Sequence, residues 1–176
     1  MTSTRVLAPR RGLVGEVTVP PSKSYTHRAV AMASLAGGRS RIKNPLFSRD
    51  TNATIAACRA FGAKITQTDS SLLIDGTDPR TPDDVVNVEN SGTTLRFMTS
   101  ILSLVPEGHS VLTGDSSIRR RPMEPLLDAL AGLGVEAWTT RNNGCAPVVV
   151  KGGGMKGGRS PMKGDVLGLP FRGNWI

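Results

Sequence analysis

The sequence predicts an α/β (α+β) fold built from two copies of one βαβαββ unit. Helical and strand-like hydrophobic patterns alternate along the chain, and the elements return in the same order in its second part. The segment CRAFGAKITQTDSSLLIDG matches LAGLGVEAWTTRNNGCAPVVVKGG in layout, with a helix-ending glycine, two strands and a closing glycine in register. Because one such unit cannot bury the face of its own sheet, we expect the copies to pack together.

The first unit is expected to span residues 15–84. The stretch VPPSKSYTHRAV, residues 19–30, is typical of a strand-to-helix junction. Ser24 and Asp50 are expected to cap two helices, and Gly37–Gly38 and Gly62 to end them. The elements predicted after the junction are a helix over 24–35, a strand over 41–44, a helix over 50–61 and a hairpin over 63–68 and 71–75.

The second unit is expected to span residues 85–161. Its turn at Asn90–Ser91–Gly92 precedes a helix, and Gly134 ends a later one. The predicted elements are a strand over 85–88, a helix over 93–104, a strand over 109–112, a helix over 123–133 and a hairpin over 135–140 and 147–151. A third unit begins near residue 162, and we interpret 162–176 as its divergent or truncated start.

The composition favours a small-molecule binder over a nucleic-acid binder. The 176 residues carry a net charge of +8, but only 4% are aromatic, and the basic groups lack the interleaved aromatic residues on which bases stack. Small phosphorylated or carboxylated ligands therefore fit better. The two cysteines lie in no metal-binding pattern, so no metal is expected. Without a signal pattern or an apolar run of about 18 residues, the chain is expected to be cytoplasmic.

The repeat places similar anion-binding groups at the start of two helices. Ser24 with Arg28 opens the first, and Gly92–Thr93 with Arg96 opens the second. Free backbone N–H groups at a helix start favour an anion, and an arginine one turn later adds positive charge. Any single arginine is more often a solvated surface residue, and Ser24 could be only a cap. The recurrence of the arrangement favours the binding interpretation.

Two further cations extend this pattern. Lys23 directly precedes the first helix, so its flexible amine could lie over the same opening. Arg121 lies in the loop that enters the later helix of the second unit. Cations that converge from separate elements suit a substrate that carries both phosphate and carboxylate. His27 is interpreted as a helix-face residue rather than a base.

Three motifs closely resemble the 5-enolpyruvylshikimate-3-phosphate (EPSP) synthase family, and the match runs from about residue 15 to 166. They are PPSKSYTHR, ENSGTTLRFMTSIL and LTGDSSIRRRPMEPLLDALAGLGV, in the family's order. The resemblance implies transfer of enolpyruvyl from phosphoenolpyruvate to shikimate 3-phosphate, through a tetrahedral intermediate and with no metal or organic cofactor. It also implies the inside-out α/β barrel of the enolpyruvyl transferases, in which each of two globules holds three βαβαββ units.

The resemblance implies eight ligand-site residues in three roles. Those for shikimate 3-phosphate are Lys23, Ser24 and Arg28. Those for phosphoenolpyruvate are Lys23, Gly92 and Arg121. Those that shape the loop are Asn90, Thr93 and Arg96. The inhibitor glyphosate occupies the phosphoenolpyruvate site in the family, and this chain has Phe97 near that loop where many members carry proline.

Two departures from the family concern the ends of the chain. After Gly164–Val166 the family continues with a Ser-Ser-Gln run, whereas this chain reads LGLPF. The family's proton-transferring residues lie further on, so no catalytic residue is assigned. Residues 1–14 correspond to a segment that packs on the opposite globule. We therefore expect an N-terminal substrate-binding portion with two units present and the third missing, which is inactive without a complementary C-terminal chain and prone to self-association.

Two alternative functions stay open. The chain could be a non-catalytic anion-binding module or a remnant, in which case carboxylates such as Asp50, Asp115 and Glu124 are only caps and surface charges. It could also be the sister enzyme that acts on UDP-N-acetylglucosamine. That enzyme pairs its lysine with asparagine and usually carries a reactive cysteine in the loop, whereas this chain has Lys23–Ser24 and Asp115–Ser117. The difference favours the shikimate enzyme.

Overall fold

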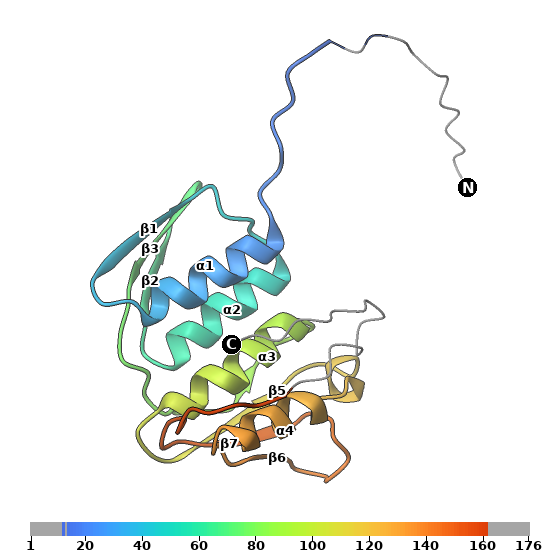
Figure 1. Ribbon diagram of the computed structural model, residues 1–176. Coiled ribbons are helices and arrows are strands. Elements are labelled where there is room, and N and C mark those ends of the chain that lie inside the picture. Colours follow the sequence, from blue (N-terminus) through green and yellow to red (C-terminus); the bar gives the residue numbers. More distant parts are fainter. Residues whose placement is uncertain (1–11, 13, 162–176) are drawn as a thin grey trace.

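The first unit folds as a three-stranded antiparallel sheet with two helices on one face (Figure 1). Its structure comes from a computed structural model that describes residues 12 and 14–161. The strand order is β1-β3-β2, and Arg39 pairs with Asp75 at one end of the β1–β3 ladder. The elements are α1 (Lys23–Leu35), β1 (Arg39–Lys43), α2 (Arg49–Ala60), β2 (Lys64–Gln67) and β3 (Ser71–Asp75).

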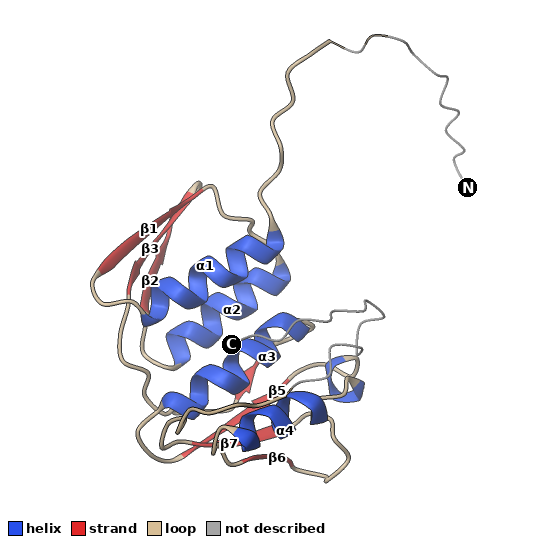
Figure 2. Cartoon of the chain, in the orientation of Figure 1, coloured by secondary structure: helices blue, strands red, loops and turns tan. Residues whose placement is uncertain are grey.

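The second unit repeats this plan with one more strand. Its order is β4-β5-β7-β6, in which β4 and β5 are parallel and the other pairs are antiparallel (Figure 2). The strands are β4 (Val86–Asn87), β5 (His109–Thr113), β6 (Ala137–Thr139) and β7 (Val148–Lys151). The helices are α3 (Gly92–Ile101), the short 3₁₀ turns η1 (Leu102–Leu104) and η2 (Ile118–Arg120), and α4 (Glu124–Gly132).

Equivalent glycines end the later helix of each unit, as predicted. Gly62 and Gly134 both have positive φ, at 116° and 83°. In each case the next residue donates its N–H to the carbonyl five positions back, from Ala63 to Cys58 and from Val135 to Leu130. Glycine is needed here because residues with a Cβ rarely adopt positive φ. The repeat seen in the sequence is therefore a repeat of backbone geometry.

A second pair of glycine contacts closes each unit. The N–H of Gly76 donates to the carbonyl of Gly38, and the N–H of Gly152 donates to the carbonyl of Gly108. A Cβ at Gly76 would collide with the carbonyl oxygen of Ala36. The contact leaves no room for a side chain, so the closing glycine is a steric requirement.

Three local predictions were wrong. The caps of α1 and α2 are Ser22 and Ser48, not Ser24 and Asp50, because only the earlier serines accept from the backbone N–H three residues on. In α2, Thr51 also bonds back to the N–H of Ser48, which forms a reciprocal capping box. No strand precedes α1 within residues 14–22, where the exposed chain runs away from both units (Figure 1).

The two units share one hydrophobic core, which is dominated by Val, Leu, Ile and Ala. Helix α2 lies between α1 and α3, and its inward face is made of small residues such as Ala53, Ala57 and Cys58. Burial in this apolar setting raises the pKa of the Cys58 thiol to about 12, which fits a packed, unreactive cysteine. Within the described part of the chain, no helix has the length and apolar character of a membrane span.

The unit boundaries 15–84 and 85–161 stay a prediction, in which α1 to β3 fall in the first range and β4 to β7 in the second. The predicted third-unit start, 162–176, lies outside the described residues. The same holds for the N-terminal segment 1–14, apart from residues 12 and 14. The helix predicted over 93–104 ends as an α-helix at Ile101 and continues as the 3₁₀ turn η1.

The closing glycine gives a stability prediction. Gly76→Ala is expected to lower the free energy of unfolding by about 1–3 kcal/mol, because the added methyl group forces the Ala36 carbonyl to shift. Gly37→Ala is the matched control, since a Cβ there meets nothing within 4 Å, and its effect should stay within about 0.5 kcal/mol. Urea unfolding measures both. Equal effects of the two substitutions would contradict the steric argument.

Candidate functional site

One cluster of site residues lies at the start of α1. Lys23 is the first residue of the helix, and its Nζ lies 2.8 Å from Oδ2 of Asp50, in the first turn of α2. The side chains are 53% and 29% exposed, so this ion pair contributes little to stability and can exchange partners. Ser24 follows, exposed to solvent. Asp50, which was predicted to be a cap or surface charge, does not cap α2 but is a partly exposed charge that pairs with Lys23.

Arg28 connects this cluster to the second unit. Its Nη1 donates to the carbonyl of Ser24 at 3.0 Å, and its Cζ lies 5.7 Å from the centre of the Phe97 ring in α3. A guanidinium at this distance from an aromatic face is stabilised by the ring quadrupole. Phe97, which belongs to α3 of the second unit, therefore contacts a cation at the start of α1.

A second cluster surrounds the start of α3. Ser91 caps this helix by accepting from the N–H of Thr94, and Thr93 lies half-buried in its first turn. A Cβ at Gly92 would lie 2.5 Å from Nη1 of Arg121 and 3.2 Å from Nη1 of Arg96. The bare glycine backbone thus faces two guanidinium groups that come from different elements.

The two arginines of the second cluster are held near one another despite their charge. Arg96 donates to the carbonyls of Gly92 and Pro122, at 3.3 and 3.4 Å. Burial lowers the pKa of Arg96, and the charge of nearby Arg121 lowers it further. Arg96 stays cationic at neutral pH despite this shift, since arginine does not lose its proton in proteins. The arrangement is a concentrated positive charge at a helix N-terminus, which favours an anion.

Asp115 connects the loop that carries Arg121 to the turn before α3. Its Oδ2 accepts from Nδ2 of Asn90 at 2.6 Å, and its Oδ1 accepts from the backbone N–H groups of Ser117 and Ile118 at 2.9 Å. The N–H of Ile118, then the Asn90 amide and, less strongly, the N–H of Ser117 hold the pKa of Asp115 below its usual value. Asp115 therefore closes the turn before η2, whose cap position is Ser117, and it also fixes Asn90.

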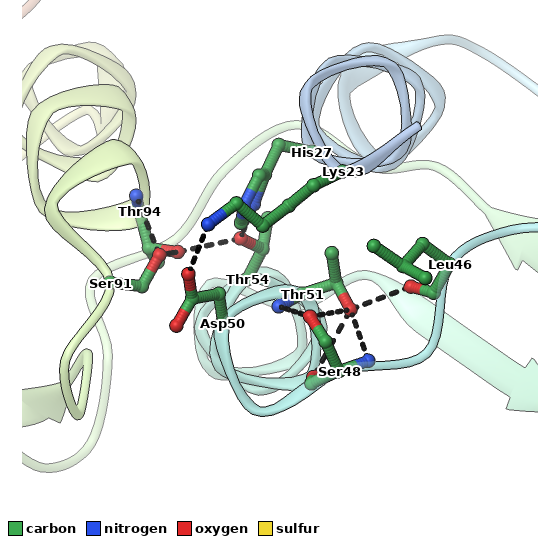
Figure 3. A network of polar contacts seen from close by, with 9 residues as sticks. All are labelled: Lys23, His27, Leu46, Ser48, Asp50, Thr51, Thr54, Ser91 and Thr94. Atoms are coloured by element: carbon green, nitrogen blue, oxygen red, sulfur yellow. Dashed lines mark hydrogen bonds and ion pairs between the residues drawn. The ribbon is translucent and has the colours of Figure 1, made fainter. Parts of the chain in front are cut away.

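A buried line of polar side chains crosses the three helices between the clusters (Figure 3). Nδ1 of His27 lies 2.6 Å from Oγ1 of Thr54, which lies 2.6 Å from Oγ1 of Thr94, which lies 2.6 Å from Oγ of Ser91. None of the four residues is more than 1% exposed. The prediction of His27 as a helix-face residue missed its burial, and nothing in the sequence pairs Thr54 with Thr94.

The eight predicted site residues form two neighbouring clusters rather than one contact network. Lys23, Ser24 and Arg28 form the first, and Gly92, Arg96 and Arg121 the second, with Thr93 in the same helix turn and Asn90 in the preceding loop. Within the described residues no three His, Cys, Asp or Glu side chains gather as metal ligands do.

Comparison with known proteins identifies the family. The family model described as EPSP synthase (3-phosphoshikimate 1-carboxyvinyltransferase) matches residues 7–167. The chain belongs to the EPSP synthase family. It is 51% identical over 169 residues to the 3-phosphoshikimate 1-carboxyvinyltransferase of Methanococcus maripaludis strain C6, and 53% identical over 155 residues to that of Methanothermobacter thermautotrophicus.

The match to these EPSP synthases covers only part of their length. The alignments include 91% and 88% of this chain but 39% and 36% of the two relatives. An EPSP synthase structure from Acinetobacter baumannii superposes with a TM-score of 0.74 at 33% identity, over 79% of this chain and 32% of that one. The chain therefore corresponds to the N-terminal portion of the family and has the matching part of its fold.

The buried histidine of this EPSP synthase portion titrates abnormally. Burial lowers the pKa of His27 from its model-compound value of 6.5, and Lys23 and Arg28 on the same helix lower it further, whereas Asp50 of α2 raises it. The unfolded chain therefore binds a proton at a pH where the folded chain does not. The stabilisation that neutral His27 gives the folded chain is fully present above pH 6.5, and it is lost as the pH falls toward the lower pKa of the folded state.

This linkage predicts a pH-dependent stability. Between about pH 7.5 and pH 5.5 the free energy of unfolding should fall, and His27→Gln should flatten that slope even though it lowers stability overall. His109, which is exposed and is the other histidine of the chain, provides the control His109→Gln, which should keep the slope. Urea unfolding at several pH values measures the slope of the free energy of unfolding for each variant. An unchanged slope in His27→Gln would contradict a buried neutral imidazole.

Proposed function

We propose that this chain is the N-terminal substrate-binding portion of a cytoplasmic EPSP synthase of the shikimate pathway, the enzyme that makes a precursor of the aromatic amino acids. It binds shikimate 3-phosphate and phosphoenolpyruvate side by side. The observation that carries the proposal is the pair of cationic clusters on α1 and α3, which the Arg28–Phe97 contact brings together. The identity of the two substrates is inferred from membership of the EPSP synthase family.

The cluster at α3 suits phosphoenolpyruvate. This ligand carries a phosphate and a carboxylate, and two guanidinium groups can donate charge-assisted hydrogen bonds to such anions. Gly92 allows the ligand to approach the backbone, because a side chain there would compete for the space next to Arg121. Asn90 and Thr93 shape this turn, and Asp115 holds Asn90 in place. Glyphosate, as an anionic inhibitor, is proposed to bind in the same cluster.

The cluster at α1 suits shikimate 3-phosphate. Ser24 and Arg28 are one turn apart on an exposed face, where a hydroxyl and a guanidinium can bind the same phosphate. Lys23 is paired with a single, partly exposed carboxylate, and a phosphate with close to two negative charges competes for it well. We assign these residues the roles of binding and orienting the substrates. No general acid or base is assigned.

The binding step is tested by titrating the chain with each ligand and following backbone amides by NMR. Shikimate 3-phosphate should shift amides of residues 22–28, and phosphoenolpyruvate those of residues 90–96. Lys23→Ala should weaken both ligands about tenfold, because it removes a charge-assisted contact shared by both. Lys23→Arg should not restore binding fully, since a planar guanidinium group replaces a compact ammonium group.

Lys43, exposed on β1, provides the matched control. Lys43→Ala removes the same charge from the chain but leaves the clusters intact, so both affinities should stay within about twofold of the parent. Equal losses in Lys23→Ala and Lys43→Ala would show that net charge, rather than a site, attracts the ligands.

Catalysis is tested with a coupled phosphate-release assay. The chain alone should release no phosphate from the two substrates, whereas mixing it with a second chain that carries the rest of a relative's length should restore turnover. Correct placement of acid and base groups is needed in addition to binding. Turnover by the chain alone would contradict the need for a complementary chain. Binding without turnover in the mixture would favour the anion-binding module, and turnover only with UDP-N-acetylglucosamine would favour the sister enzyme.

A further inference from the structure

The buried line of His27, Thr54, Thr94 and Ser91 has a direction that follows from counting hydrogens. Ser91 Oγ accepts from the N–H of Thr94, so its own hydrogen is free to be donated to Thr94 Oγ1. Thr94 then donates to Thr54, and Thr54 donates to Nδ1 of His27. In this order every hydroxyl hydrogen has an acceptor, and His27 carries its proton on Nε2.

The opposite order of donors and acceptors leaves one more buried polar group without a hydrogen-bond partner. If Nδ1 of His27 donates, the hydrogen of Ser91 has no acceptor within the described residues, and Nε2 of His27 is unpaired in either order. Buried polar groups without partners are costly, so the first order is favoured. A line of short hydrogen bonds with a single favoured order specifies the relative position of three helices more tightly than apolar packing does.

Both ends of this line lie at the candidate site. His27 precedes Arg28 in α1 and lies one turn after Lys23, whereas Ser91 is the cap residue directly before Gly92. Thr54, in the middle, belongs to the helix that carries Asp50, the partner of Lys23 (Figure 3). The line therefore connects the shikimate-side cluster to the phosphoenolpyruvate-side cluster through the protein interior.

We propose that Thr54 and Thr94 are positioning residues, which hold the Gly92 turn at a fixed place relative to α1 so that both clusters face one pair of substrates. The proposal rests on the proposed function for the identity of the ligands. Thr54 bonds to both neighbours, so its hydroxyl is the link whose removal separates α1 from α3. A merely stabilising role would affect all parts of the core alike, whereas a positioning role acts on the start of α3.

The first test needs no ligand. Thr54→Val removes the hydroxyl at nearly constant shape, and Thr54→Ser keeps it. The matched control is Thr99→Val, since Thr99 is also fully buried but donates only to Leu95 within its own helix. Amide hydrogen exchange of Thr94 and Leu95, both bonded to Ser91, should be about tenfold faster in Thr54→Val than in Thr99→Val, with Thr54→Ser close to the parent. Equal exchange in both valine variants overturns the proposal.

The second test separates the two ligands. By NMR titration, Thr54→Val should weaken phosphoenolpyruvate about tenfold and shikimate 3-phosphate by less than about twofold, and Thr54→Ser should restore the parent affinities. Equal weakening of both ligands, or weakening that Thr99→Val reproduces, overturns the proposal. If the parent chain binds neither ligand, the proposed function fails, and the exchange experiment still decides whether Thr54 positions α3.

Discussion

The packing of α2 between α1 and α3 is the contact on which the rest of the structure depends. The buried positions of α2 are occupied mainly by small residues, with Ile55 as the large exception. Small side chains let helix axes approach closely, and only at close approach can a side chain as short as threonine reach hydrogen-bond partners on both neighbours. Thr54 does so at 2.6 Å on each side. The same packing places Asp50 beside Lys23 and joins the two units in one core.

The duplication explains why two cationic clusters lie next to each other. Each unit begins its first helix with a serine cap, Ser22 or Ser91. Each also closes with the same contact, in which the glycine after the last strand donates to the glycine before the strand that pairs with it. Equivalent helix starts then come together when the units pack. The side chains have diverged, because the first start carries Lys23 and the second carries Gly92. One geometry thus provides a flexible amine on one side and a bare backbone on the other.

The sequence was sufficient for the order of the helices and strands from α1 onward, because glycine marks helix ends in both units and the hydrophobic periodicity is clear. It was insufficient for the caps, since Ser22 and Ser24 are equally good candidates until the backbone shows which one accepts from Tyr25. The strand predicted before α1 has no hydrogen-bonded neighbour within the described residues. The line from His27 to Ser91 could not be predicted, because Thr54 lies 27 and 40 positions away from its two partners.

The charges of the two clusters differ in how they are balanced. Lys23 has a carboxylate partner, Asp50, so a ligand that binds Lys23 must replace an existing ion pair. Arg96 and Arg121 both face Gly92, and after burial the charge of Arg121 contributes to the lowered pKa of Arg96. An anion placed between two cations is attracted by both, and these attractions offset the repulsion between the cations. Under the proposed function the α3 cluster therefore has the stronger intrinsic preference for an anion. Under the proposed function the α1 cluster selects among anions, because only one of sufficient charge displaces Asp50 from Lys23, and a phosphate monoester meets that requirement better than a carboxylate.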